Sequence, residues 1–264
     1  MKRPKFIACL VLIALSVAGG TATALATDQD VRKILAPTGT LRAGLYPGTP
    51  TSILPDGPDG PRGVGYDLGK EFAKRLGVPY EPVVFSKNAE VLAAVKTGRV
   101  DVVFTNASAA RAEDMLFGPP YLEIELGYLV RKASPVTTLS EVDLLGRRIG
   151  VIEGSTSDAT LSRELKNAVV VRAPTIRAGI EMLSTGSIDA FATNKATLFE
   201  MAEKLPGSKV LDGQWGIDRH AMAIPKGREQ GLPFLHKFTE DIKAEGLATA
   251  AIARAGLRGA TPLK

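Results

Sequence analysis

The chain has little of the chemistry that most catalytic and metal sites use. Its 264 residues include one cysteine and two histidines. Cys9 lies near the amino terminus, so the rest of the chain offers no thiol nucleophile and no disulfide. His220 and His236 lie far apart in the sequence, in no metal-ligand spacing, and we interpret both as structural. We therefore expect no cysteine catalysis, no metal centre and no cofactor.

Long apolar runs are also scarce, and the one clear example lies at the amino terminus. Residues 1–5 read Met-Lys-Arg-Pro-Lys, an apolar run follows over 6–18, and residues 24–26 read Ala-Leu-Ala. A basic start, a short apolar run and a small-x-small site are typical of a cleavable secretory signal peptide. The run is shorter than the ~20 residues that a membrane span needs. We predict export to the periplasm, with residues 1–26 removed.

Positive charge is less abundant than the formal net charge of +5 suggests. Cleavage would remove Lys2, Arg3 and Lys5 and no acidic residue, which lowers the net charge to +2. A nucleic-acid interface normally needs a strong basic excess. We therefore expect no nucleic-acid partner.

One ten-residue pattern occurs twice. Residues 97–106 read Thr-Gly-Arg-Val-Asp-Val-Val-Phe-Thr-Asn, and residues 185–194 read Thr-Gly-Ser-Ile-Asp-Ala-Phe-Ala-Thr-Asn. Each copy is typical of a turn, a short apolar strand and a polar strand end, and such repeats usually mark a repeated supersecondary unit. Ligands of open α/β sheets bind outside strand ends. We predict two similar lobes that face a cleft; chance similarity is the alternative.

Hydrophobic periodicity predicts strands that alternate with helices, which indicates the α/β class. The Pro- and Gly-rich stretch 46–65 is expected to be a loop, and Pro82 favours an edge strand. The expected strands are 41–45, 80–85, 100–104, 126–130, 148–152, 169–171, 188–192 and 221–224. The expected helices begin near Tyr66, at an Asn88 cap and at Ser155. A further one carries Ile176, Ile180 and Leu183, another ends near Lys204, and the last one carries Phe234, Phe238 and Ile242.

Several short runs carry a resemblance to a known family. They are Gly65-Tyr66-Asp67-Leu68, the run 72–77, Gly98-Arg99-Val100-Asp101, Arg111 ahead of Phe117 and Pro120-Tyr121, Gly150-Val151 with Gly154-Ser155-Thr156, and the run 186–190. Over roughly residues 38–256, their order and spacing resemble the bacterial extracellular solute-binding proteins of family 3, the receptors of polar amino acid ABC importers. The resemblance implies a two-lobe periplasmic-binding-protein fold (type II-like), each lobe a mixed sheet flanked by helices.

The resemblance also implies how the chain is divided and what it meets. Two crossings would join the lobes, which would close on the ligand like a hinge. We expect residues 27–126 in lobe 1, 127–219 in lobe 2, and 220–264 back in lobe 1. The expected partners are a small-molecule ligand and an ABC permease in the inner membrane, and we expect the protein to act as a monomer.

Arg111 is the sharpest candidate for ligand binding. A guanidinium can hold a carboxylate through two parallel hydrogen bonds. In the family that the chain resembles, an arginine at this place holds the ligand's α-carboxylate. The alternative is a surface arginine paired with Glu113 or Asp114.

Ser155 and Thr156 follow a predicted strand and open a predicted helix. Free backbone N–H groups at a helix start, together with a hydroxyl, suit an anion. The alternative role of Ser155 is to cap the helix, and both roles can hold at once. We expect Thr156, and less strongly Ser155, to contact the ligand.

Polar pairs end both copies of the repeat. Thr105 and Asn106 in one copy, and Thr193 and Asn194 in the other, offer neutral hydrogen-bonding groups to a ligand. Their alternative role is to cap the following segments. Receptors of the resembled family commonly carry an aspartate near Asn194 that pairs with the ligand's ammonium. Asn194 is uncharged, so the sequence leaves open whether the ligand is an α-amino acid.

Tyr46 follows the first predicted strand, where relatives often place an aromatic side chain over the ligand. Tyr121 and Tyr128 flank the first predicted crossing, and buried aromatic residues at such positions are more often core. We therefore include only Tyr46 in the candidate site.

We hypothesise a periplasmic protein that captures a small carboxylate-bearing solute, an amino acid or a related organic acid, for import. One alternative is a dehydratase-like enzyme on the same fold, which would need a cleft acid of raised pKa such as Glu123 or Glu153. The other is an accessory partner of another periplasmic protein that docks through the 46–65 loop.

Overall fold

The computed structural model describes residues 28–54 and 60–263. The predicted signal peptide lies outside the described residues. The strands are β1 (Leu41–Leu45), β2 (Tyr80–Val84), β3 (Val102–Asn106), β4 (Met115–Val130), β5 (Arg148–Ile152), β6 (Val169–Ala173), β7 (Ala190–Asn194), β8 (Lys209–Val210), β9 (Gly216–Pro225) and β10 (Ala260–Pro262). The helices are α1 (Asp28–Leu35), α2 (Val64–Leu76), α3 (Asn88–Lys96), α4 (Ala109–Ala112), α5 (Thr156–Glu164), α6 (Ile176–Thr185), α7 (Lys195–Glu203), α8 (Leu232–Ala244) and α9 (Leu247–Ala255), with short 3₁₀ turns η1 (Leu139–Glu141) and η2 (Glu229–Gly231).

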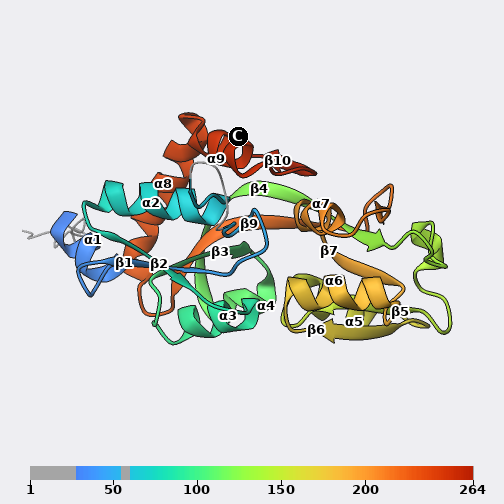
Figure 1. Ribbon diagram of the computed structural model, residues 1–264. Helices are drawn as coiled ribbons and strands as arrows, with labels where there is room; N and C mark the ends of the chain where they lie inside the picture. Colours follow the sequence, from blue (N-terminus) through green and yellow to red (C-terminus); the bar gives the residue numbers. More distant parts are fainter. Residues whose placement is uncertain (1–27, 55–59, 264) are drawn as a thin grey trace, which may run out of the picture.

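The described strands form one mixed sheet that extends through two lobes. Its order is β2-β1-β3-β9-β4-β7-β5-β6, and β8 and β10 pair with β4 beside this path. The strands β1, β2 and β3 are mutually parallel, as are β5, β6 and β7, whereas β4 and β9 run antiparallel to their neighbours. In Figure 1, helices cover each end of the sheet, and β4 and β9 run between the lobes. The α/β two-lobe prediction is confirmed.

Both crossings lie inside long strands. β4 pairs with β9 from Met115 to Leu126 and then with β7 from Leu126 to Leu129. We expected a strand only over 126–130, and the strand in fact begins ahead of Gly118-Pro119-Pro120. The pairing shifts register around these residues, and β4 continues. Proline cannot donate to a ladder, but a bulge accommodates it. The lobe boundaries at 126 and 219 remain our proposal.

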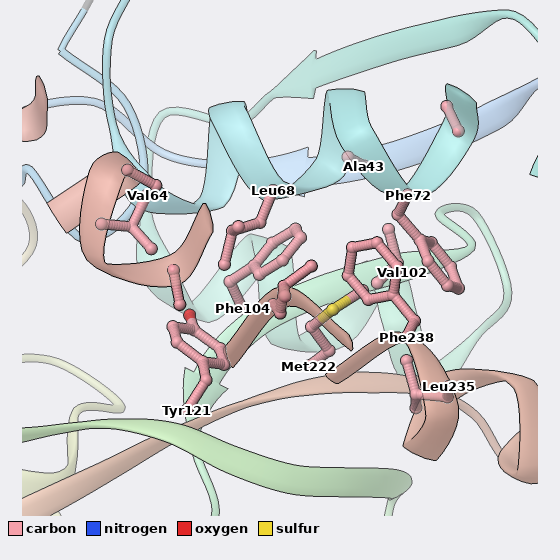
Figure 2. Packing of buried hydrophobic residues seen from close by; sticks show 14 of the residues in the cluster. Ala43, Val64, Leu68, Phe72, Val102, Phe104, Tyr121, Met222, Leu235 and Phe238 are labelled. Carbon is pink, nitrogen blue, oxygen red and sulfur yellow. The ribbon is translucent and has the colours of Figure 1, made fainter. Parts of the chain in front are cut away.

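Lobe 1 has its own hydrophobic core. In α2, Leu68, Phe72 and Leu76 are spaced by four residues and are all buried, so one face of the helix packs inward. Phe72 meets Phe238 of α8 edge to face, with ring centroids 4.8 Å apart. Figure 2 shows Met222 of β9 beside this pair. Burying each such side chain stabilises the fold by about 1.5–3 kcal/mol.

Lobe 2 has a second core, which depends on glycine. Gly150 of β5 and Gly179 of α6 both face the buried ring of Phe191. A Cβ on Gly150 would lie 2.4 Å from the Ile188 side chain, and a Cβ on Gly179 would lie 2.4 Å from the Phe191 ring. Only glycine allows helix, strand and ring to pack this closely.

The ten-residue pattern is a structural repeat, as predicted. In lobe 1 the Asp101 carboxylate accepts from the Arg42 backbone at 2.9 Å and its guanidinium at 2.8 Å. In lobe 2 the Asp189 carboxylate accepts from the Arg148 backbone at 2.9 Å and its guanidinium at 3.1 Å. Each arginine also donates to the carbonyl of the repeat glycine. Each aspartate thus fixes the first strand of its lobe to the strand that ends at the cleft.

Of two smaller predictions, one is confirmed and one is wrong. β2, which contains Pro82, lies at one edge of the sheet as expected. The predicted cap at Asn88 is wrong by one residue, because Lys87 holds the extended cap position and Asn88 is the first residue of α3. The Glu90 carboxylate accepts the Ser86 and Lys87 backbone N–H groups at 3.1 and 3.3 Å, which satisfies this helix start and releases the Asn88 side chain.

No helix within residues 28–54 and 60–263 has the length and apolar character needed to span a membrane.

Candidate functional site

A cavity of about 40 Å³ lies between the two lobes. A buried water needs about 10–15 Å³ of such volume, so the space holds about three water-sized groups. All seven side chains that the sequence singled out line this cavity: Tyr46, Thr105, Asn106, Arg111, Ser155, Thr156 and Asn194. The fold thus brings the predicted residues of both lobes together.

Direct hydrogen bonds hold the lobes against each other at the cavity. The Asn106 amide, at the end of β3, donates to the Thr156 hydroxyl at the start of α5 over 3.1 Å. The hydroxyl of Thr197, which lines the cavity, lies 2.8 Å from that of Thr49, and both side chains are buried. The described lobes are therefore closed on the cavity.

The Gly154 carbonyl is a second bridge between the lobes. It belongs to the turn between β5 and α5, and it accepts from the Arg111 guanidinium at 3.3 Å. It also accepts from the Asn88 side-chain amide at 3.3 Å. Gly154 has a φ of 71°, the left-handed conformation that glycine adopts without strain. One backbone oxygen thus engages two donors from the opposite lobe.

Arg111 is held in place by its own short helix and by the end of β3. The Ser108 hydroxyl caps α4 and accepts the Arg111 backbone N–H at 3.3 Å. One guanidinium nitrogen donates to the Thr105 hydroxyl at 2.6 Å and to the Asn106 carbonyl at 3.4 Å. Thr105 therefore orients Arg111 toward the cavity.

The surface-pair alternative for Arg111 is wrong. Asp114 pairs with Lys96 at 2.7 Å, and no ion pair within the described ranges includes Arg111. Every acceptor that the structure gives its guanidinium is a neutral oxygen. Burial lowers the pKa of Arg111, and nearby Asp218 partly offsets that effect. The site therefore contains a desolvated cation with no anionic partner at contact distance, which favours an anionic ligand.

Ser155 and Thr156 have different roles at the start of α5. The Ser155 hydroxyl accepts the Asp158 backbone N–H at 3.1 Å, so the capping alternative is confirmed for this residue. The Thr156 hydroxyl accepts from Asn106, and the Thr156 side chain also lowers the pKa of nearby Asp218. Ligand contact by either residue stays a prediction.

The two Thr-Asn strand ends differ. Asn194 caps α7, because its side-chain oxygen accepts the Thr197 backbone N–H at 2.9 Å. Asn106 is not a helix cap. Its side-chain oxygen accepts the Arg219 backbone N–H at 2.8 Å, while its amide reaches Thr156. The capping alternative thus holds for Asn194, whereas Asn106 connects β3, β9 and the opposite lobe.

Tyr46 lines the cavity directly after β1, as predicted. Its backbone N–H donates to the Ser52 hydroxyl at 3.0 Å. Burial raises the pKa of Tyr46 to about 12, although Arg111 opposes this effect. Tyr121 and Tyr128 are buried in the cores, which agrees with their interpretation as core residues. Tyr46 is thus a neutral aromatic wall beside Arg111.

Sequence reasoning missed two titratable groups at the site, Asp218 and His220 of β9. Both line the cavity and are 6% exposed. Burial raises the pKa of Asp218 to about 6, against the effects of Arg111 and Thr156. Burial lowers the pKa of His220 to about 3, and Arg111 adds to this effect.

A sequence signal for them existed. Residues i and i+2 of a strand share a face, and β9 alternates exposed Ile217 and Arg219 with buried Asp218 and His220. We expected this strand to begin only at Ala221, so this alternation ahead of it was not used. We also interpreted His220 as merely structural, but the structure places it in the cavity wall.

The acids that we named for the enzyme alternative are not at the cavity. The Glu123 carboxylate accepts from the exposed Arg219 side chain at 2.7 Å, and Glu153 is exposed. Within the part of the chain that the structure describes, no group of three or more His, Cys, Asp or Glu side chains is arranged to hold a metal ion.

Comparisons with known proteins agree with this geometry. The model of the bacterial extracellular solute-binding proteins, family 3, matches residues 41–254. The L-cystine-binding protein TcyJ of Escherichia coli K12 is 23% identical over 247 residues, which cover 92% of each chain. A solved L-cysteine solute receptor of Neisseria gonorrhoeae is 25% identical, with a TM-score of 0.76 over 85% of this chain and 92% of that one. An ancestral amino-acid-binding protein, described as a precursor of cyclohexadienyl dehydratase, has a TM-score of 0.73 at 23% identity over 84% of this chain and 97% of its own.

Proposed function

The chain belongs to the bacterial extracellular solute-binding proteins of family 3, and on that premise we propose that it binds a small carboxylate-bearing solute between its lobes. The solute would be an amino acid or a related organic acid. It would be captured in the periplasm and delivered to an ABC permease in the inner membrane. We propose that the protein acts as a monomer and as a binding protein rather than an enzyme.

One observation carries this proposal: Arg111 lines the interlobe cavity as a partly buried cation without a carboxylate partner among the described residues. Burying an unpaired charge is costly, so a ligand carboxylate would relieve an existing penalty. A guanidinium also offers two parallel donors, which matches the two oxygens of a carboxylate.

The surroundings of Arg111 support the same ligand. The free N–H groups in the first turn of α5 are directed to the cavity beside Thr156, and a helix start attracts an anion. Thr105 fixes one guanidinium nitrogen, which leaves the other for exchange. The incoming carboxylate would replace the Gly154 carbonyl as the acceptor of that second nitrogen.

The functions of the relatives support an amino acid as the solute. TcyJ is named an L-cystine-binding protein, and the Neisseria structure is a receptor for L-cysteine. With the lobes closed as described, the cavity of about 40 Å³ suits a small solute. A larger solute would need the lobes to close less tightly.

Arg111→Ala tests the proposal. The mature protein would be titrated calorimetrically with the twenty L-amino acids, L-cystine, and the organic acids lactate, malate and succinate. Loss of a buried charge-assisted contact costs about 2–5 kcal/mol, so we expect affinity for any bound probe to fall at least ~30-fold. Arg163→Ala is the matched control, because Arg163 is exposed and pairs only with neighbouring Glu164 at 3.1 Å. Unchanged affinity in Arg111→Ala would refute the carboxylate site.

A further inference from the structure

Four aspartates are buried in the described part of the chain, and one of them differs from the others. Asp101, Asp158 and Asp189 each pair with an arginine, at 2.8, 2.9 and 3.1 Å. Asp218 pairs with no lysine or arginine in that part of the chain; its one charged-group contact is His220, at 3.9 Å. An arginine partner thus offsets the burial of the other three aspartates, whereas Asp218 has no such partner among the described residues.

His220 does not neutralise Asp218. Its pKa is lowered to about 3 by burial and by Arg111, so the imidazole is neutral near pH 7. The Asp218 Oδ1 atom and the His220 Nδ1 atom are both buried and have no hydrogen-bond partner among the described residues. Two buried polar atoms therefore lack partners on the same wall of the cavity.

Arg111 and Asp218 line the same cavity but are too far apart to form an ion pair. They influence each other electrostatically, since each shifts the pKa of the other. The Thr156 side chain of the opposite lobe lines the same cavity and lowers the pKa of Asp218. The cavity thus presents one cation and one anion, separated, each without a charged protein partner.

We propose that Asp218 binds the ammonium group of the solute whose carboxylate Arg111 holds, so that the ligand is an amino acid in its zwitterionic form. This inference rests on the proposed function of the cleft. Opposite charges at two fixed points match a zwitterion and discriminate against an acid without an amino group. His220 would add a neutral acceptor or donor next to the ammonium.

The sequence left open whether the ligand is an α-amino acid, because Asn194 offers no negative charge to an ammonium group. The Asn194 side-chain oxygen is used to cap α7, and the residue is uncharged. Asp218 supplies the missing negative charge from a different element, β9, one of the two strands that run between the lobes. A ligand bound to both Arg111 and Asp218 would therefore contact β9 and α4 of the cleft wall, next to Thr156 of the facing lobe.

Burial explains why a ligand would be needed at Asp218. A buried carboxylate without a partner favours its neutral form, and the pKa of about 6 agrees with that. An ammonium group at this position would stabilise the ionised form and satisfy the free oxygen. The penalty of burying Asp218 is thus offset only when a cationic group arrives.

Matched probe pairs test the proposal. Each pair has an L-amino acid and the acid that carries a hydroxyl in place of the amine: L-alanine and L-lactate, L-serine and L-glycerate, and L-glutamate and L-2-hydroxyglutarate. The twenty L-amino acids and L-cystine are included singly. Binding to the wild-type protein, Asp218→Asn and Asp212→Asn is measured by calorimetry at pH 7.5. Asp212 is an exposed aspartate that pairs with Lys209, so its variant controls for the loss of one carboxylate.

We expect the wild-type and Asp212→Asn proteins to prefer the amine of a bound pair at least tenfold, and Asp218→Asn to lose that preference. Affinity of Asp218→Asn for the hydroxy acid should stay within about threefold, which shows that the variant is folded. Hydroxy or dicarboxylic acids that bind while every amino acid fails would overturn the inference but leave the proposed function intact. No response to any carboxylate would overturn both.

Two further results would overturn the assignment of Asp218. An Asp218→Asn protein that keeps the full preference for the amine would show that the ammonium lies elsewhere. Release of water or ammonia from a bound probe, followed by proton NMR, would show that Asp218 acts as a proton donor or acceptor instead. An unchanged probe spectrum after overnight incubation supports binding alone.

Discussion

The two lobes contain the same structural device, but they surround it differently. In lobe 1, Asp101 is fully buried and accepts from two arginines, Arg42 at 2.8 Å and Arg228 at 2.9 Å. In lobe 2, Asp189 pairs with Arg148 alone, at 3.1 Å, and the Arg148 side chain is 44% exposed. The same sequence motif thus gives a buried charge cluster in one lobe and a partly solvated pair in the other.

The strand ends that follow these aspartates differ in the same direction. In lobe 1 the Thr-Asn pair orients Arg111 and reaches across the cavity. In lobe 2 the Asn194 side chain caps a helix of its own lobe. A repeat therefore predicts shared architecture, while each copy acquires its own contacts, and here lobe 1 holds the charged groups that would grip a ligand.

The largest expected effect separates the two aspartates. Removing one member of a buried ion pair typically costs about 3–5 kcal/mol, so Asp101→Asn should lower the free energy of unfolding by that amount. Asp189→Asn should cost about 1 kcal/mol, because exposed partners contribute less. Urea unfolding followed by circular dichroism reports the whole chain, and the fluorescence of Trp215, the one tryptophan, reports lobe 2. Equal losses would contradict the difference between the lobes.

The glycines of the first strands give the next test. Gly44 of β1 and Gly150 of β5 each lie two residues after the arginine of their lobe. A Cβ on Gly150 would lie 2.4 Å from Ile188, whereas one on Gly44 would lie 3.1 Å from its nearest neighbours. Overpacking costs about 1–3 kcal/mol, so Gly150→Ala should fall at the high end and Gly44→Ala at the low end. Thermal unfolding measures both, and a larger loss at Gly44 would show that lobe 1 is packed more tightly.

The cleft between the lobes should respond to pH through Asp218. Its pKa is about 6, so roughly one-tenth is ionised at pH 5 and affinity for an amino acid should fall about tenfold between pH 8 and pH 5. The groups that face it do not titrate in that window: His220 has a pKa of about 3, Tyr46 one of about 12, and arginine stays protonated. Asp218→Asn should flatten the profile, and an equally steep profile in that variant would assign the titration to another group.

In the ligand-free protein, the contribution of Asp218 to stability should fall as the pH rises, whereas ligand affinity should rise. The folded-state pKa of Asp218 is raised above the ordinary aspartate value of 3.8, so the folded state binds more protons between pH 3.8 and about 6. Its contribution to stability therefore falls as the pH rises through that range. Comparing urea midpoints of the wild type and Asp218→Asn at pH 4 and pH 7 checks the sign.

The smallest expected effects concern the paired asparagines. Asn194→Ala removes a helix cap and should cost about 1 kcal/mol of stability. Asn106→Ala removes the contact with Thr156 and leaves the Arg219 N–H without its acceptor. We expect the ratio of lost ligand affinity to lost stability to be greater at Asn106, measured by calorimetry and thermal unfolding. A greater ratio at Asn194 would place the tighter ligand contact in lobe 2.

Much of this architecture could be predicted from local patterns. The strands 41–45 and 148–152 have the predicted bounds, because short apolar runs between turn residues carry a strong signal. The length of β4 could not be predicted, since whether Gly118-Pro119-Pro120 ends a strand or forms a bulge depends on its partner β9. The part of the repeat formed by Arg42 and Arg148 was missed because its spacing, 106 residues, differs from the 88 residues between the aspartates.

Only some of the residues that line the cavity could be predicted from the sequence, for a similar reason. Residues placed by a helix start or by a repeated strand end, such as Thr156 and Asn106, are marked by local sequence. Asp218 has no such mark, because its importance comes from what is absent around it in space. A sequence shows which aspartates exist, but only the assembled fold shows which one lacks an arginine.

The Gly154 carbonyl has a consequence for how such a receptor would report its cargo. Because this oxygen accepts from Arg111 and Asn88, it imitates one oxygen of a bound acid. Among the residues that the structure describes, four hydrogen bonds join the lobes at the cavity, and each contributes about 0.5–1.5 kcal/mol. A receptor that can shut upon itself would present the shape of a loaded molecule while carrying nothing. A permease that recognised only the closed shape would then be activated by the empty receptor. Productive import would require it to sense the ligand itself or how long the receptor stays closed.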